Sequence, residues 1–553
     1  MRTSRRNFML GAAAAAGACG SDEEGSLEDA LRSLAPDSNT DEPPDIVFVC
    51  VDDLNDWPAP FEGPKPTAYP HNVLTPNMDL LATLGTVFQR AYCAAPICGA
   101  SRSATMTGLP PHVSGVTELE NILQPIEGFG PLLVDDFTTL PRLLKASGYV
   151  TRGAGKIFHN GGYNEYEKPG HYDGEAWDEY EIINNRAGCP QTFPDVGGPQ
   201  VDAKVRPCAE DWPTLPDAQV ANFGIEKLGE PHDGSPLFLA LGFFKPHAPW
   251  EAPQSYYDMY PIESIKSIDP FVERLDQADL TLSGCTSLRD LKSSPDDGQW
   301  EGRTRAAIAG YLACITHTDH LLGEVISAVA QRSRRTLFVL WSDHGYFMGE
   351  KHGWKKPKLY ERASRVPLIV LDTGNINGQS TNKIVSLNDV FPTVLDYAGI
   401  ANPVGYGHSL RPLVEDGNAP WSQTSVLTTL NFRSAHRQHT KSHYNPDIDL
   451  CMKQRGITRC GEFTEQLCPS YGARMLGASH ALRTERPGEQ YRYIRYHDSG
   501  VFLKPGGVPY RELYDLAADP AERTNLLAPQ NVTPAIEELA SLLDAELDEK
   551  LDT

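Results

Sequence analysis

The sequence predicts an α/β fold with a mixed, mostly parallel sheet flanked by helices, followed by a smaller C-terminal α+β unit. Three short apolar runs, at residues 45–51, 237–242 and 336–341, have the composition of strands that are buried on both faces. Strands of this kind occur almost only in parallel sheets that helices cover. A chain of 553 residues also exceeds the size at which one core keeps growing, so a large domain plus a second unit is expected.

Acidic residues follow two of these runs directly. Asp52 and Asp53 come after the first run, and Asp343 and His344 come just after the third. In open α/β sheets, residues at the carboxyl ends of strands point into the crevice where ligands bind. An isolated Asp-Asp pair is most often a solvated turn, but two acidic strand ends together indicate a site for a hard cation with oxygen ligands.

One cysteine lies in a pattern that is known from a family of hydrolases. The segment Cys98-Gly99-Ala100-Ser101-Arg102 resembles the C-x-P/A-x-R signature of type I sulfatases, with Ala100 where most members carry proline. Taken alone, a free structural cysteine would be the commoner explanation, but the other motifs follow in the order of the family. The resemblance implies that a formylglycine-generating maturation enzyme oxidises Cys98 to Cα-formylglycine, whose hydrated aldehyde carries two hydroxyls.

Three further segments carry lysine and histidine side chains. Gly155-Lys156-Ile157-Phe158-His159 resembles the G-K-x-F-H segment of iduronate-2-sulfatase-like proteins, and Lys245-Pro246-His247-Ala248-Pro249 resembles their K-P-H-x-P segment. The spacing back from Val366-Pro367-Leu368 makes Lys356 the counterpart of the family's sulfate-binding lysine, and it leaves the adjacent Lys355 as an alternative. A lone lysine or histidine is more often structural or solvated. The joint order of these segments, mostly just after a predicted strand, favours a site.

The resemblance implies a metal site and a nucleophile. The calcium (Ca2+) ligands would be Asp52, Asp53, Cys98, Asp343 and His344. The hydrated form of residue 98 would attack sulfur, held and polarised by Arg102, while Lys356 and calcium would bind the sulfate oxygens. A helix expected to begin near Ser101 would add backbone N–H groups on the anionic side.

The resemblance also implies two groups that transfer protons. His247 would be the general acid for the leaving alcohol, and His159, assisted by Lys156, would be the base that releases the sulfate. The two histidines could also exchange these roles. The expected catalytic residues are therefore Cys98, Arg102, Lys156, His159, His247 and Lys356.

The similarity extends from about residue 45 to residue 527 and implies an alkaline-phosphatase-like fold. We expect the catalytic domain over residues 45–440 and the C-terminal subdomain over residues 441–553. Helices are expected from Thr75 as N-cap with Pro76 at the first position, around 311–322, and at 387–395. The subdomain should form a half-buried antiparallel sheet from residues 483–486, 491–496 and 512–516, covered by a helix after Thr533-Pro534.

The N-terminus resembles an export signal. Residues 1–19 contain Ser4-Arg5-Arg6-Asn7-Phe8 and an alanine-rich run that is too short to span a membrane, as in a twin-arginine signal. Cys19 ends this stretch in a pattern like a lipobox without the usual leucine, which leaves a lipid anchor as an alternative to simple export. Residues 20–44 are acidic and weakly periodic, so we expect a flexible linker. Together these features predict a bacterial periplasmic or cell-surface protein.

The eleven cysteines fit an oxidising compartment. Cys50 and Cys314 lie in a predicted strand and helix and are expected to be core residues. Cys189 with Cys208, and one pair among Cys451, Cys460 and Cys468, are the expected disulfides, with their connectivity left open.

The formal net charge of -24 argues against nucleic acid as a partner. It would also repel a sulfated saccharide at long range, but local cations act at close range, where distant surface carboxylates are screened beyond ~10 Å. The predicted activity is the exo-desulfation of a sulfated uronic acid or related sugar in a polysaccharide, with the identity of the sugar and the oligomeric state left open. Two alternatives remain: a phosphodiesterase or phosphonate monoester hydrolase of the same superfamily, and a non-catalytic glycan-binding lipoprotein that keeps Cys98 as a thiol.

Overall fold

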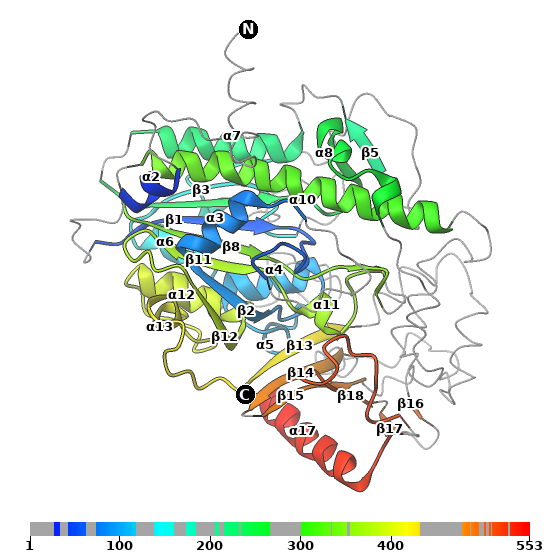
Figure 1. Cartoon of the computed structure of the whole chain (residues 1–553). Helices are drawn as coiled ribbons and strands as arrows, with labels where there is room; N and C mark the ends of the chain where they lie inside the picture. Colours follow the sequence, from blue (N-terminus) through cyan, green and yellow to red (C-terminus); the bar gives the residue numbers. More distant parts are fainter. Residues whose placement is uncertain are drawn as a thin grey trace, which may run out of the picture.

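The computed structural model describes residues 27–33, 42–61, 73–117, 138–159, 173–183, 205–208, 215–231, 234–265, 300–332, 334–350, 354–431, 478–486, 488–496, 503–504, 508–509, 511–528 and 531–552. Within these ranges a large α/β unit is joined to a smaller antiparallel sheet that carries one helix (Figure 1). The predicted export signal at residues 1–19 and the boundary predicted after residue 440 lie outside the described residues. Among the described helices, none combines the length and the apolar content that crossing a bilayer requires.

The large unit is built on an eight-stranded mixed sheet. In spatial order its strands are β12 (Gln379–Ser386), β2 (Thr86–Tyr92), β11 (Leu368–Asp372), β8 (Thr336–Ser342), β1 (Asp45–Val51), β6 (Leu237–Phe243), β3 (Val150–Gly155) and β4 (Glu179–Glu181). Only β11 runs antiparallel to its neighbours, β2 and β8. The prediction of a mixed, mostly parallel sheet is therefore confirmed, and the three apolar runs of the sequence are its central strands β1, β6 and β8.

Helices cover both faces of this sheet, because both faces of its central strands are apolar. On β1, Val47, Val49 and Val51 pack into one core, and the alternate side chains of the strand, such as Phe48, pack into the other. The first core includes α3 (Pro76–Leu84), α7 (Pro216–Gly229) and α10 (Trp300–Ala330), and the second includes α4 (Cys98–Thr107), α6 (Leu140–Ala146), α12 (Val390–Tyr397) and α13 (Arg411–Glu415). Figure 1 shows α7 and α10 on one side of the sheet and α12 and α13 on the other.

Two expectations about helices need correction. Residues 27–33 belong to the predicted flexible linker but form α2 (Leu27–Ser33), because Leu31 is buried in the core beside α10. The helix expected near Ser101 is α4, which begins at Cys98, so residue 98 itself occupies the first turn. The helix predicted from Pro76 is confirmed as α3, although the Thr75 side chain makes no cap hydrogen bond.

The smaller unit is an antiparallel sheet covered by a helix, as predicted, but it has four strands, and it is covered on both faces rather than half-buried. Its strands are β13 (Ser425–Asn431), β14 (Ala478–Arg486), β15 (Glu489–Arg495) and β18 (Arg511–Asp515), in that order. The helix α17 (Pro534–Asp552) covers one face, and the other face packs on Phe347, Leu359 and Tyr360 of the large unit. The strand β13 precedes residue 440, so this sheet takes one strand from the region assigned by sequence to the catalytic domain.

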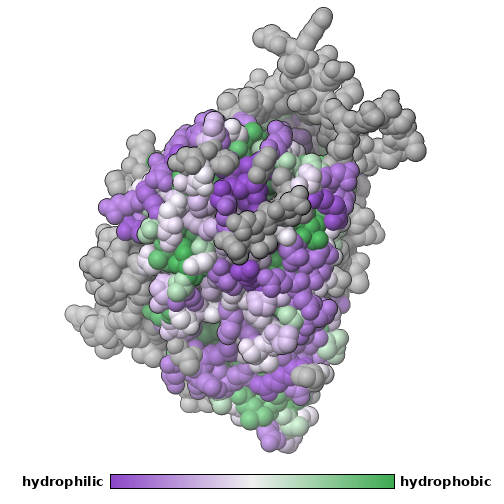
Figure 2. All heavy atoms as spheres, turned by 90° about the vertical axis from the view of Figure 1, so that its left-hand side faces the viewer, coloured by the Kyte–Doolittle hydropathy of each residue, from purple (hydrophilic) through white to green (hydrophobic). Residues whose placement is uncertain are grey.

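The remaining elements are short. They are α5 (Pro111–Ser114), α8 (Gln254–Asp258), α11 (Glu361–Ser364), the 3-10 helices η1 (Gly174–Ala176), η2 (Ile262–Ser264) and η6 (Leu387–Asp389), and the strand pairs β5 (Val205–Cys208) with β7 (Trp250–Pro253), β9 (Phe347–Met348) with β10 (Trp354–Lys355), and β16 (Leu503–Lys504) with β17 (Val508–Pro509). One view of the surface is mostly hydrophilic, with hydrophobic residues in a few separate patches (Figure 2).

The described cysteines follow the expected division. Cys50 and Cys314 are buried free thiols, as are Cys93 and Cys98. Cys208 is disulfide-bonded, and its partner lies outside the described residues. The other cysteines of the predicted pairs, Cys189, Cys451, Cys460 and Cys468, also lie outside them, as does Cys19.

Candidate active site

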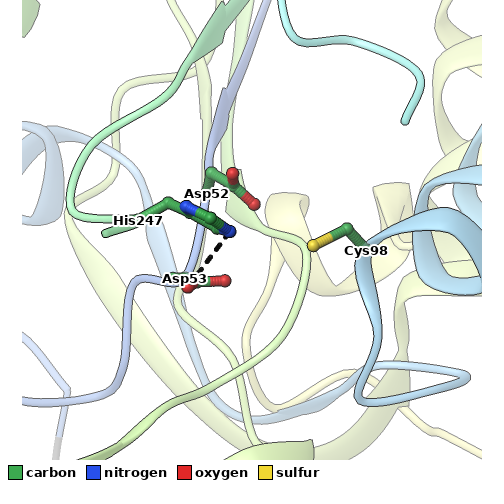
Figure 3. A group of neighbouring side chains, drawn as sticks. All are labelled: Asp52, Asp53, Cys98 and His247. Carbon is green, nitrogen blue, oxygen red and sulfur yellow. Dashed lines mark ion pairs between the residues drawn. The ribbon is translucent and has the colours of Figure 1, made fainter. Parts of the chain in front are cut away.

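The candidate site lies at the carboxyl ends of the central strands. Val51 of β1 pairs with Ser342 of β8 on one side and with Phe243 of β6 on the other. The residues that follow these three positions therefore emerge at the same edge of the sheet. Figure 3 shows the His247 imidazole, the Asp52 and Asp53 carboxylates and the Cys98 thiol gathered around one region, with the ion pair between His247 and Asp53 marked.

The turn after β1 is fixed by hydrogen bonds to its backbone. Asp53 has a positive φ of 63°, a conformation that costs energy for a residue with a side chain. Its N–H donates to Asp343 Oδ1 at 3.2 Å, and its carbonyl accepts from the Tyr311 hydroxyl at 2.7 Å. The first bond holds the Asp343 carboxylate against the backbone of Asp53, although 290 residues separate the two in the chain.

Cys98 stands at the N-terminus of α4. Every residue of this ten-residue helix is buried, and Ser101 Oγ donates a hydrogen bond to the carbonyl of Asp343. This bond attaches the first turn to the end of β8. The free N–H groups and the positive end of the helix dipole therefore lie where an anion would bind.

Arg102 connects the two acidic strand ends. Its side chain is fully buried; Nε lies 2.8 Å from Asp343 Oδ2, and Nη2 lies 3.3 Å from Asp52 Oδ1. Nη1 donates to the carbonyls of Lys156 and Ile157. Burial alone would lower the pKa of the guanidinium, but Asp343 and the other nearby anions raise it well above its usual value. Arg102 is therefore always positively charged, and it lies against Asp52 and Asp343.

Two lysine ammonium groups approach the thiol and the carboxylates. Lys356 Nζ lies 3.0 Å from Cys98 Sγ and 2.7 Å from Asp53 Oδ1, and Lys156 forms an ion pair with Asp52. Burial would raise the pKa of the Cys98 thiol, but Lys156 and Lys356 outweigh it and hold the pKa well below its usual value. The site therefore favours a negative group at position 98.

The geometry distinguishes Lys356 from its neighbour. Lys355 belongs to β10, where it pairs with Phe347 and has a φ of 68°. Lys356, the next residue in the chain, places its ammonium against the Cys98 sulfur. Of the two lysines that spacing could not separate, the structure brings Lys356 to the thiol.

Three histidines surround the same thiol and carboxylates. His344 Nε2 lies 3.2 Å from Cys98 Sγ; burial would lower its pKa, but Asp343 and Cys98 raise it to about 9. His159 forms a hydrogen bond with Cys98, and burial lowers its pKa. His247 Nε2 lies 3.9 Å from Asp53 Oδ2, and its side chain is 37% exposed, so it stands on the solvent side of the site. Burial also lowers the pKa of His247.

The donor atoms fit a divalent cation that prefers oxygen. Two overlapping sets have all their donor atoms within 4.8 Å of one another: Asp52, Asp53, Cys98 and His247, and Asp52, Cys98, Asp343 and His344. Three buried carboxylates, Asp52, Asp53 and Asp343, are paired with three cations, Arg102, Lys156 and Lys356. A sulfate ester would bring a further negative charge into this buried site, and a divalent cation would help to balance it.

Every residue that the sequence nominated is brought together at this edge of the sheet, but the sequence missed some of their supports. Tyr311, on α10, donates to Asp53, and nothing local in the sequence indicates this long-range contact. Gly242 pairs with Gly155, and a Cβ at Gly242 would lie 2.1 Å from the carbonyl oxygen of Lys156. The close approach of β3 and β6 that positions Lys156 therefore requires glycine at position 242.

Comparison with known proteins agrees with these motifs. The chain is 29% identical over 523 residues to a sulfatase from Formosa agariphila, a match that covers 90% of this chain and 86% of that protein. It is 26% identical over 441 residues to iduronate 2-sulfatase from Mus musculus, covering 68% of this chain and 73% of the relative. It is also 26% identical over 517 residues to human arylsulfatase K, covering 90% and 82%.

Solved structures show the same fold at low identity. A protein in complex with its substrate D-glucosamine-2-N,6-O-disulfate aligns with a TM-score of 0.61 and 18% identity, covering 92% of this chain and 98% of that chain. A phosphonate monoester hydrolase from Silicibacter pomeroyi aligns with a TM-score of 0.64 and 18% identity, covering 92% and 95%. The fold is therefore shared by enzymes with different substrates. The sulfatase family profile, however, matches residues 44–400, which is more than half of the chain, and the chain accordingly belongs to the type I sulfatase family.

Proposed function

We propose that the protein hydrolyses sulfate esters, with residue 98 in its formylglycine form as the nucleophile and with a bound calcium ion. The observation that carries this proposal is the surroundings of Cys98. Its sulfur lies 3.0 Å from Lys356 Nζ and 3.2 Å from His344 Nε2, and it belongs to both sets of candidate metal ligands. Buried cations and carboxylates concentrated around one side chain are typical of an active site rather than of a structural cysteine.

The residues around position 98 would stabilise negative charge. Calcium, held by Asp52, Asp53, Asp343, His344 and residue 98, would polarise the sulfate, and the hydrated aldehyde would supply the attacking hydroxyl and the second hydroxyl that allows sulfate release. Lys156 and Lys356 add two positive charges close to the position where negative charge develops on the sulfate oxygens. Arg102 holds Asp52 and Asp343 in place and lies beneath the nucleophile.

Two histidines would transfer protons in this scheme. His247 is the general acid, because it stands on the solvent side, where the leaving alcohol departs, with Nε2 toward Asp53. His159 is the base, because it bonds to the side chain of residue 98, from which the proton is removed. Each histidine then has one proton-transfer task.

The proposed substrate is a sulfated uronic acid or related sugar of a polysaccharide, attacked from a chain end. The similarity to a protein named iduronate 2-sulfatase supports this class, as does the fold shared with a protein bound to a disulfated glucosamine. Export by the twin-arginine route, with a lipid anchor at Cys19, would place the enzyme in the periplasm or at the cell surface of a bacterium. Polymeric saccharides are accessible from that location.

The central experiment combines mass spectrometry with activity. The protein is produced with and without a formylglycine-generating enzyme, the peptide containing residue 98 is analysed, and desulfation is measured on defined sulfated saccharides and on 4-nitrophenyl sulfate. We expect formylglycine and turnover only in the co-produced sample. Cys98→Ser should lose nearly all turnover, since one hydroxyl cannot release its sulfate by this route. An active enzyme with an unmodified thiol would disprove the covalent mechanism.

The same enzyme preparation also distinguishes sulfate-ester hydrolysis from phosphonate-monoester hydrolysis. Enzymes that hydrolyse phosphonate monoesters have this fold, so a phenyl phosphonate monoester is assayed beside the sulfate esters. Faster turnover of the phosphonate would replace the proposed function. Binding of sulfated saccharides without any hydrolysis would instead indicate a glycan-binding protein.

A further inference from the structure

The loop that carries His247 is held by side chains rather than by strand pairing alone. It connects β6 to β7, and each main-chain carbonyl from residue 244 to residue 250 has a hydrogen-bond partner. Five of these carbonyls have donors of different kinds. The main-chain N–H of His247 donates to the carbonyl of Phe244, and the Thr318 hydroxyl donates to that of Lys245. The Trp250 indole donates to the carbonyl of Pro246, His247 Nδ1 to that of Ala248, and the Tyr257 hydroxyl to that of Trp250. The two remaining carbonyls, those of His247 and Pro249, both accept hydrogen bonds from the ammonium of one lysine.

That lysine is Lys245, a buried residue with a relative exposure of only 7%. Its ammonium donates to the carbonyl of His247 at 3.4 Å and to the carbonyl of Pro249, and it lies 3.9 Å from Glu251 Oε2. A lysine beside an anion site would ordinarily be expected to bind the anion. Here two of its three donors are already directed to carbonyls on either side of Ala248.

A second buried charge holds the start of the same loop. Asp217, in the first turn of α7, is 2% exposed. Its Oδ1 accepts from the N–H of Phe244 at 2.6 Å, and its Oδ2 accepts from the N–H of Lys245 at 2.9 Å. One carboxylate and one ammonium therefore fix the backbone before and after His247.

The consequence is a defined orientation of the imidazole. His247 Nδ1 lies 2.5 Å from the carbonyl oxygen of Ala248. A carbonyl only accepts, so Nδ1 carries a proton and donates it, which leaves Nε2 as the nitrogen that faces Asp53 and the site. As general acid the ring is the imidazolium, which carries a second proton on Nε2, gives that proton to the leaving oxygen and keeps the one on Nδ1. Any movement of the Ala248 carbonyl would change the direction in which Nε2 points.

We propose that Lys245 and Asp217 are positioning residues, which hold the loop so that His247 Nε2 meets the oxygen of the leaving group. This inference rests on the proposed general-acid role of His247. Neither residue needs to touch the substrate. The effect of removing either one should therefore depend on how much the leaving group needs a proton, as the effect of removing His247 does.

The test compares two aryl sulfates that differ in this need. We expect Lys245→Met to lower kcat for phenyl sulfate by roughly 10-fold or more and to change kcat for 4-nitrophenyl sulfate, whose phenolate leaves unaided, by less than about 3-fold. KM should stay nearly constant for both. The double variant Lys245→Met/His247→Ala should match His247→Ala alone, because both changes remove the same proton transfer. Equal losses on the two esters, or additive losses in the double variant, would overturn the proposal.

A matched control is Lys145, which also donates to two backbone carbonyls, of Glu175 and Trp177, but lies on α6. Lys145→Met should leave both rates unchanged. If Lys245→Met does not fold, Asp217→Asn carries the same test, since an amide keeps one acceptor and loses the other.

A crystal structure of Lys245→Met provides a readout that does not depend on turnover. The contact between His247 Nδ1 and the Ala248 carbonyl should be lost, and an unchanged imidazole would refute the inference. Failure of the parent to hydrolyse either sulfate would count against the proposed function, and the crystal structure would still decide the positioning role.

Discussion

Replacement of Arg492 by methionine should destabilise the protein strongly, because this arginine joins the small sheet to the large unit. Arg492 lies on β15 and is fully buried. It pairs with Glu361 of α11 and with Glu522 at 3.1 Å, and it donates to the carbonyl of Leu359 at 3.1 Å. In Arg492→Met both carboxylates remain buried, and Glu361 keeps the Tyr92 hydroxyl at 2.6 Å and the more distant Arg483 at 3.6 Å.

The magnitude follows from the charges left behind. Removing one partner of a buried ion pair typically costs about 3–5 kcal/mol. The pKa of Glu361 gives an independent figure: burial raises it, but Arg492 and Arg483 outweigh burial and lower it from 4.5 to about 2. That difference corresponds to about 3 kcal/mol of stability at neutral pH, shared among the arginines.

The assay is urea unfolding, with Arg495→Met as the control. Arg495 lies on the same strand and pairs with Asp544 and Asp548 of α17, but its side chain is 20% exposed, so its loss should cost about 0–1 kcal/mol. A carboxylate with a depressed pKa contributes stability above the pKa of the unfolded chain and loses it as the pH falls. The difference in the free energy of unfolding between the parent and Arg492→Met should therefore become smaller by about 1 kcal/mol as the pH falls from 6 to 4. Equal costs for the two variants at pH 7, or a gap that widens in acid, would refute the reasoning.

Three further substitutions test the site. Gly242→Ala should abolish most sulfate-ester hydrolysis, because the added Cβ would lie 2.1 Å from the carbonyl oxygen of Lys156. Gly229→Ala is the control and should leave the rate unchanged, because no atom lies within 4 Å of its added Cβ. Similar rates for the two variants would contradict the packing argument. Calcium should raise the melting temperature of the parent, and Asp343→Asn should remove that rise, measured with and without sulfate; activity that survives exhaustive chelation would exclude a metal role. Lys356→Ala should raise KM and lower kcat together, because the ammonium would contact sulfate in the ground and transition states, and unchanged kinetics would move the sulfate-binding role to another residue.

Much of the fold and site could be predicted because the evidence is local in the sequence. The apolar runs of β1, β6 and β8 are continuous, and each is followed closely by candidate site residues: directly after β1 and β8, and at His247 after β6. The short motif from Cys98 to Arg102 keeps the proposed nucleophile and its arginine about one helical turn apart on α4. Strand ends and single turns depend on neighbouring residues, so a linear pattern is sufficient to identify them.

Some elements were missed because their stability comes from distant contacts. The helix α2 has only seven residues, and it forms because Leu31 is buried beside α10, which begins more than 250 residues later. The strand β13 joins the small sheet by pairing with β14 across a long separation in the chain. Short segments such as these have weak local preferences, which tertiary packing overrides.

The sequence by itself determined the fold class, the family and the residue types around Cys98, because these depend on periodicity and on short motifs. Only the tertiary structure decided between Lys356 and Lys355, since adjacent lysines differ in direction and not in composition. Only the structure showed that Arg102 joins Asp52 to Asp343, and that Lys245 is directed to the loop of His247. The physical reason is that charge pairing and orientation depend on distances between atoms that the chain separates by up to hundreds of residues, and those distances exist only after the sheet has formed.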